Sequence, residues 1–171
     1  MPLQLDPLKT ALIAAFALGS ESLSGTDVVV KAIVTAYDVY AKTGVSCSMF
    51  PPSLVNKQGC EDTIIASATS IPPVVDVETA AGEWSLAFEN YWQGGLFGAT
   101  GLVTAITGTS ALETQLVSIW NAAAQSGGTV TSSQVAEQMA VALDAFTRTV
   151  MVKDTAFPVG PPPGCGPAPI I

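Results

Sequence analysis

Three acidic residues recur in the same local setting along this chain, and their type and spacing suit acid–base chemistry. Asp38, Glu89 and Asp144 each follow a large apolar residue and precede an aromatic residue by two positions. Two carboxylates that share a site can act as an acid and a base, because one holds the proton that the other lacks. The alternative, which we favour, places each acid on the solvated side of an amphipathic helix or at a contact with a neighbour.

Other reactive groups are scarce, since the chain has no histidine and so lacks the commonest general base. Three cysteines, Cys47, Cys60 and Cys165, are too few for a structural zinc site, which normally takes four Cys or His ligands. A disulfide between Cys47 and Cys60 is geometrically conceivable, although reduced thiols are the interpretation we favour. Residues 94–98 are rich in glycine but lack the Lys-Ser/Thr ending of a phosphate loop. We therefore expect no enzyme, no cofactor and no metal site.

The composition points to protein partners rather than to a membrane or a nucleic acid. Hydrophobic residues make up 49% of the 171 residues and charged residues only 12%, about half the share of an ordinary soluble domain. No apolar stretch approaches the roughly 20 residues of a membrane span, and residues 11–18 lack the positive flank of a signal peptide. The net charge of −8, without any basic cluster, argues against nucleic-acid binding. The surface is therefore expected to have too few charged side chains for an isolated protein and to be covered in part by other proteins.

Two short signatures recur along the chain at nearly one period. The first combines Ala, a large apolar residue, an acid, a variable residue and an aromatic residue. It occupies residues 36–40, 87–91 and 142–146, whose starts lie 51 and 55 residues apart. The second, an aliphatic pair followed by a small residue, occupies residues 12–15, 64–67 and 116–119, at a spacing of 52. Because two independent signatures agree, they predict an internal repeat.

Each repeat unit is predicted to be a helix, a turn and a second helix. In the third unit, Val135, Met139, Leu143, Phe146 and Val150 follow the rhythm of one helical face. A single hairpin cannot bury such a face by itself, so the units are expected to stack. The predicted fold class is therefore all-α, with three degenerate helical-hairpin repeats and Gly/Pro-rich connections between them.

The predicted domain boundaries follow from these repeats. We place the units at approximately residues 8–50, 60–98 and 110–152, within a helical repeat domain at residues 1–156. Residues 157–171 form a Pro-rich C-terminal tail, whose prolines exclude a helix or a central strand and favour polyproline II. Whether this tail docks or extends into solvent stays open at this point.

Large apolar residues are expected either in the core or at an interface. The predicted core comprises Phe16, Tyr37, Trp84, Phe88, Trp120, Leu143 and Phe146. The candidate partner-contact residues are Trp84, Tyr91, Trp92, Trp120, Ile170 and Ile171. Three of these, Trp84, Trp92 and Trp120, are the residues expected to line a groove if the chain binds a helix or peptide.

Residues 8–16, 30–43, 140–150 and 160–164 carry a resemblance to a known class of proteins. They resemble small Ala/Thr-rich virion structural proteins of tailed bacteriophages, of the T4-like cyanophage type. The resemblance implies a virion component that is assembled in the host cytoplasm, and it supplies no catalytic or binding residue. The resemblance does not distinguish between three locations in the virion: the tail or baseplate, the neck, and the capsid.

The sequence favours two alternative functions. The first is a virion structural component that packs in multiple copies against larger virion proteins or against itself. The alternative is a helical-repeat adaptor that binds a peptide or helix of a partner protein.

With so few charges to cover its helices, the isolated chain is predicted to self-associate. Sedimentation of the purified chain at micromolar concentration measures this directly. A soluble monomer that binds none of the virion proteins of its source would instead favour the adaptor.

Overall fold

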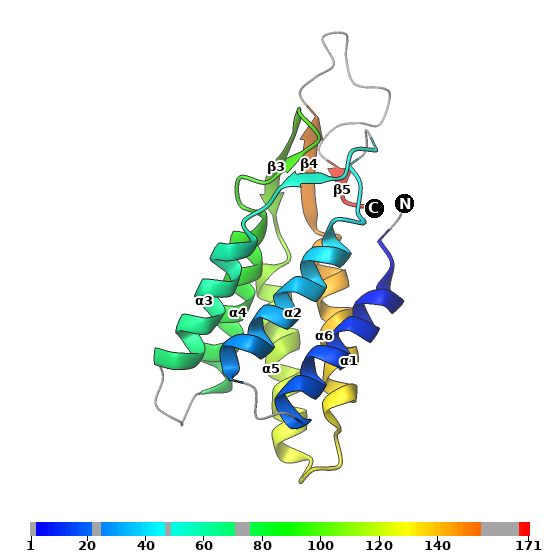
Figure 1. The fold of residues 1–171 in the computed structure, drawn as a ribbon. Coiled ribbons are helices and arrows are strands. Elements are labelled where there is room, and N and C mark those ends of the chain that lie inside the picture. The colour runs from blue at the N-terminus through cyan, green and yellow to red at the C-terminus, as the bar shows by residue number, and fades with distance from the viewer. Residues whose placement is uncertain (1–2, 22–24, 47–48, 71–75, 155–167) are drawn as a thin grey trace.

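The computed structural model describes residues 3–21, 25–46, 49–70, 76–154 and 168–171. These residues are mostly helical, and their helices follow one another as three hairpins (Figure 1). The helices are α1 (Leu5–Glu21), α2 (Thr26–Ala41), α3 (Lys57–Ser70), α4 (Val77–Trp92), α5 (Thr109–Gln125) and α6 (Ser132–Thr147).

The sequence signals for the ends of these helices are local. Thr131 begins α6 with a capping box, in which the backbone N–H of Gln134 donates to Thr131 Oγ1 (3.2 Å) and the backbone N–H of Thr131 donates to Gln134 Oε1 (2.8 Å). Asp76 caps α4 by accepting from the backbone N–H of Glu78. Such caps satisfy N–H groups that have no partner inside the helix.

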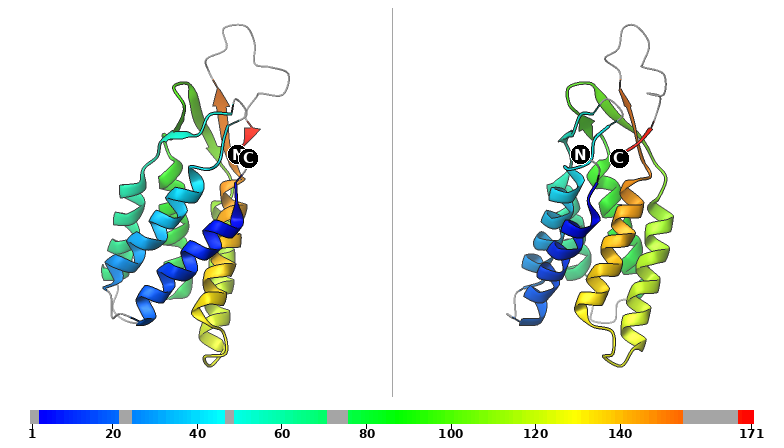
Figure 2. Two further views of the ribbon diagram at one scale, coloured as in Figure 1. Left: turned by 45° about the vertical axis from the view of Figure 1, so that its right-hand side comes forward. Right: turned by 90° about the vertical axis from the view of Figure 1, so that its right-hand side faces the viewer.

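The helices close into a ring. Each packs against the next along the chain, and α1 also packs against α6, so that the first hairpin meets the third (Figure 2). Tyr37 of α2, Phe88 of α4 and Leu143 of α6 occupy the same position of the first signature, and all three side chains are completely buried. The second helix of every hairpin therefore supplies the centre of the bundle.

The predominance of helix is confirmed, but a five-stranded antiparallel sheet caps one end of the bundle, so the fold is not purely all-α (Figure 1). The strands pair in chain order, and they are β1 (Pro52–Leu54), β2 (Leu96–Phe97), β3 (Gly101–Ile106), β4 (Val150–Asp154) and β5 (Ala168–Pro169). β1 and β3 lie in the predicted Gly/Pro-rich connections, whereas β2 and β4 lie at the ends of the predicted second and third units. Val150 therefore begins a strand, and its assignment to the helical face of the third unit was wrong. These segments cross the end of the bundle, where their backbone groups need partners and find them in one another.

The end of the chain docks on the chain itself. Ile170 is buried, the N–H of Val45 donates to the carbonyl of Ile171 (3.0 Å), and the N–H of Ile171 donates back to Val45 (3.2 Å). Gly44 permits this approach, because a Cβ at that position would meet the side chain of Ile170 at 2.6 Å. Residues 168–171 of the predicted tail thus dock on the bundle, while residues 157–167 lie outside the described part.

All seven residues of the predicted core either belong to the buried core or pack against it. Tyr37, Phe88, Leu143 and Phe146 are buried, whereas Phe16, Trp84 and Trp120 are only partly buried. Ala36, Ala87 and Ala142, which begin the first signature, are all buried as well. Superposition of the three units as structural repeats stays a prediction.

Phe146→Ala is predicted to destabilise the fold by about 3–5 kcal/mol, because it empties a fully enclosed ring site in the core. Urea unfolding followed by circular dichroism measures the loss. Val141→Ala, at a half-exposed position of the same helix, is the control and should change stability by less than about 0.5 kcal/mol. Equal unfolding midpoints for the two variants would contradict the assignment of the buried face of α6.

Candidate functional site

The three recurring acids lie at contacts between helices rather than in solvent. Tyr91 Oη of α4 donates to Asp38 Oδ1 of α2 (2.8 Å), and Tyr40 Oη of α2 donates to a carboxylate oxygen of Asp144 on α6. Asp38 is only 7% exposed. The aromatic residue of one signature thus binds the acid of another, and the three hairpins are tied together through these bonds.

Each acid is also bound by the residue four positions later on its own helix. Lys42 Nζ lies 2.8 Å from Asp38 Oδ2, and the Arg148 guanidinium makes two bonds of 2.9 Å to Asp144. In the second hairpin the Gln93 amide bonds to Glu89, which also accepts from the hydroxyl of Thr109 on α5 (2.7 Å). The arrangement holds all three carboxylates in place instead of presenting them as a pair to a substrate.

The Tyr37 hydroxyl lies at the centre of the same region. Trp92 Nε1 donates to it (2.8 Å), and it bonds to Thr147 Oγ1 (2.8 Å). Because the Thr147 hydroxyl proton goes to the carbonyl of Leu143 (2.7 Å), Tyr37 is the donor to Thr147. Tyr37 therefore uses its proton and a lone pair within the protein, and α2, α4 and α6 meet at this one oxygen.

Burial sets the protonation states of these groups. It raises the pKa of Tyr37, Tyr40 and Tyr91 above the ordinary tyrosine value. Burial also raises the pKa of the Cys60 thiol to about 12, with a smaller contribution from Glu61, so the thiol stays protonated and weakly nucleophilic at neutral pH. For Asp144, burial opposes ionisation, but the hydrogen bonds from Arg148 and Tyr40 outweigh it and lower the pKa.

Three candidate partner-contact residues are enclosed by the fold, and this corrects their assignment. Tyr91, Trp92 and Ile170 are buried, so a partner cannot reach them on the folded chain. The Trp92 ring also stacks on Phe97 of β2, with ring centroids 5.9 Å apart. Helical periodicity placed these side chains on an apolar face, but contacts from α2 and the sheet decide that the face is internal.

The other candidate residues keep some exposure. Trp84 of α4 and Trp120 of α5 are partly buried and meet edge to face, with ring centroids 5.5 Å apart. Ile171 is 49% exposed. Cys60 is a free thiol, and its conceivable disulfide partner Cys47 lies outside the described residues.

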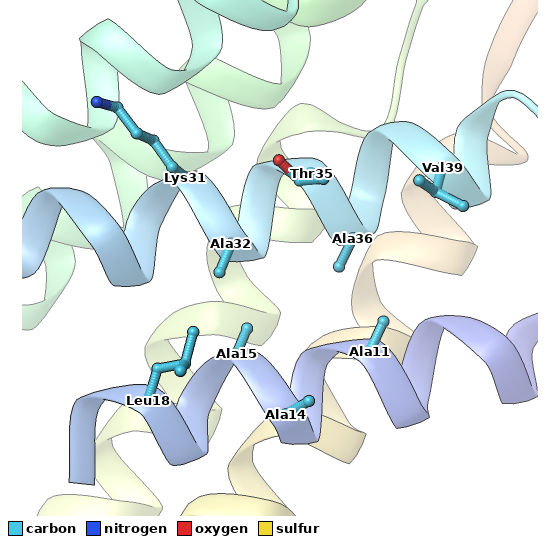
Figure 3. A pocket seen from close by; sticks show the side chains of 9 residues that line it. All are labelled: Ala11, Ala14, Ala15, Leu18, Lys31, Ala32, Thr35, Ala36 and Val39. Carbon is cyan, nitrogen blue, oxygen red and sulfur yellow. The ribbon is translucent and has the colours of Figure 1, made fainter. Parts of the chain in front are cut away.

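An apolar groove lies between α1 and α2 on the described surface (Figure 3). It has a volume of about 570 Å³ and is lined by Ala11, Ala14, Ala15, Leu18, Lys31, Ala32, Thr35, Ala36 and Val39. In Figure 3 the Lys31 ammonium points away from the space between the two helices, so the floor is uncharged. We call this the α1/α2 groove. Sequence reasoning missed it, because alanines at helical spacing serve internal helix packing equally well.

A smaller groove lies between α5 and α6, at positions that the two signatures align with the first. It is lined by Gln115, Ser118, Ile119, Gln138, Val141 and Ala142 and has a volume of about 270 Å³. On this alignment Ala14 corresponds to Ser118, Ala15 to Ile119 and Ala32 to Gln138. The first hairpin thus has small apolar residues where the third has larger or polar ones, and of the two grooves the α1/α2 groove has the larger volume and the apolar floor.

The described part of the chain contains no cluster of three Cys, Asp or Glu side chains that could hold a metal ion. Among its helices, none combines the length and hydrophobicity that crossing a membrane requires.

No protein-family model, no curated protein and no solved structure matches this chain.

Raising the pH is predicted to unfold the chain above about pH 10. The sequence contains only three tyrosines, and all three have raised pKa values in the folded state. A raised pKa stabilises the fold below the unfolded-state value and loses that contribution as the pH rises past it. Tyrosinate absorbance should therefore appear together with loss of the helical circular dichroism signal. Full tyrosine ionisation in a chain that stays helical would refute the buried network.

Asp144→Asn is predicted to cost about 1–2 kcal/mol at neutral pH, because Arg148 and Tyr40 lose a charged acceptor. The lowered pKa of Asp144 stabilises the fold above the ordinary aspartate value of about 3.9, and this contribution is lost as the pH falls below it. Urea midpoints of the variant and the wild type should therefore converge in acid. Glu137→Gln, an exposed acid on the same helix, is the matched control and should show no such pH dependence.

Proposed function

We propose that this chain is a non-enzymatic structural component of a bacteriophage virion that packs in multiple copies against larger virion proteins. The α1/α2 groove is the observation that carries the proposal, because it offers a helix-sized apolar site on the outside of the bundle. The low share of charged residues and the resemblance of residues 8–16 and 140–150 to tailed-phage proteins support the same setting.

The occupant that suits the α1/α2 groove is an α-helix of the neighbouring protein. Ala11, Ala14, Ala15 and Leu18 form one stripe at helical spacing, and Ala32, Ala36 and Val39 form the facing stripe (Figure 3). A third helix laid along the groove would contact both stripes at once, and the alanines allow its axis to approach closely. The half-exposed Leu18 and the largely exposed Val39 would be covered by this contact.

A second apolar region supports contact with more than one neighbour. Met49, Phe50, Leu54 of β1 and Leu102 of β3 are all exposed by 42% or more, and they lie at the sheet end of the molecule. Exposed apolar side chains gathered in one region of a soluble protein usually mark a contact site. Because the groove runs along the flank of the bundle, a copy placed between two larger proteins could use both regions.

The alternative function is an adaptor that binds a helix reversibly. The groove between Trp84, Trp92 and Trp120 that this hypothesis required does not exist as such, since Trp92 is buried. The α1/α2 groove could serve the adaptor in its place. The two functions differ in outcome, because a structural component is retained at fixed stoichiometry in purified particles and an adaptor is not.

Ala14→Trp is predicted to reduce incorporation of the chain into particles at least about tenfold, because the indole fills the groove and clashes with a docked helix. Quantitative mass spectrometry of purified particles from the source measures copy number for the wild type and the variants. Ser118→Trp, at the aligned and equally exposed position of α5, is the matched control and should incorporate normally.

Both substitutions lie at exposed positions, so both variants should melt like the wild type by circular dichroism. Equal incorporation of the two variants would show that the α1/α2 groove is not the docking site. If wild-type chain is absent from particles yet binds a helix through this groove, the adaptor replaces the structural role.

A further inference from the structure

A separate apolar pocket is formed by side chains from several helices, in the half of the bundle away from the sheet. It has a volume of about 270 Å³ and is lined by Phe16, Thr26, Val29, Val30, Ile33, Trp84, Trp120 and Met139. These residues come from five of the six described helices, α1, α2, α4, α5 and α6. The pocket is therefore created by ring closure and does not belong to any one hairpin.

The pocket connects the core with the surface. Its floor consists of Val30, Ile33 and Met139, which are at most 3% exposed. Its walls are aromatic and partly exposed. Trp84 and Trp120 meet there with their ring planes at 83°, and Phe16 of α1 contributes a third ring. A molecule from solvent can thus reach a site whose base is part of the hydrophobic core.

The chemistry of the lining excludes most occupants. No charged side chain lines the pocket, and its only hydroxyl belongs to Thr26, an exposed residue at the first turn of α2. Water would find too few hydrogen-bond partners, and an ion would lose its hydration without compensation. An apolar void that stays empty also forfeits dispersion contacts along its whole lining. An uncharged apolar molecule satisfies all of these conditions.

We propose that this pocket binds an uncharged aromatic molecule of about two fused rings. An apolar cavity of about 150 Å³ in another protein accommodates benzene, so the larger volume here suits a bicyclic ring system. The faces and edges of Trp84, Trp120 and Phe16 offer offset and edge-to-face contacts, which aromatic ligands use in preference to purely aliphatic ones. This binding site is independent of helix docking in the α1/α2 groove.

Titration with naphthalene tests the proposal, with naphthalene disulfonate as a charged ligand of the same ring outline. The chain has three tryptophans, so its indole N–H signals in a nitrogen–proton NMR spectrum can be assigned with Trp84→Phe and Trp120→Phe. Naphthalene should shift the signals of Trp84 and Trp120 saturably and raise the melting temperature. The signal of Trp92, which donates to Tyr37 outside the pocket, should stay in place. The disulfonate should do neither.

Two substitutions fill the pocket from different positions. Val29→Phe fills it from a partly buried wall, and Thr26→Phe fills it from an exposed position that is less costly to change. Either variant, once shown to keep the wild-type circular dichroism spectrum, should bind naphthalene at least about tenfold more weakly. Val28→Phe, at an exposed position of the same helix that lines neither the pocket nor the α1/α2 groove, should bind it as the wild type does. Absence of a saturable shift in the wild type, or unchanged affinity in a folded filling variant, would overturn the proposal.

Discussion

A hydroxyl buried away from water has to find its hydrogen bonds inside the protein, and the fold depends on how Tyr37 does so. Its oxygen accepts from Trp92 and donates to Thr147, while its ring meets Phe88 and Tyr91 edge to face at 4.8 and 5.2 Å. These contacts join α2 to α4 and α6, so that all three hairpins meet at one side chain. A polar group placed at the centre thus selects one arrangement of the three hairpins, since other arrangements would leave the hydroxyl unpaired.

The same interactions differ from one signature to the next. Tyr40 reaches the acid of the third signature and Tyr91 reaches the acid of the first. The third signature ends in Phe146, which has no hydroxyl, and Glu89 of the second accepts from Thr109 instead. The acids that first suggested catalysis therefore serve as acceptors between helices, and their partners differ from one hairpin to the next.

Because the interior is occupied by this network, the surfaces remain for binding. Closure of α1 on α6 buries one side of the first hairpin and leaves the alanines of the α1/α2 groove on the outside. The same closure encloses the aromatic pocket between five helices. Both proposed sites thus follow from the ring, although one would hold a helix of a partner and the other a small aromatic molecule.

The sequence by itself determined the helices, their pairing into hairpins and the buried face of α6, because caps and helical periodicity act within a few residues. Only the tertiary structure decided that Val103 pairs with Val152 in a sheet, that Ile170 returns to the bundle and that Trp92 is internal. Each of these depends on a partner about 50 or more residues away, or on which neighbour covers an apolar face. A local pattern shows that a face of a helix is apolar. Which helix, strand or partner covers that face depends on how distant segments of the chain pack together.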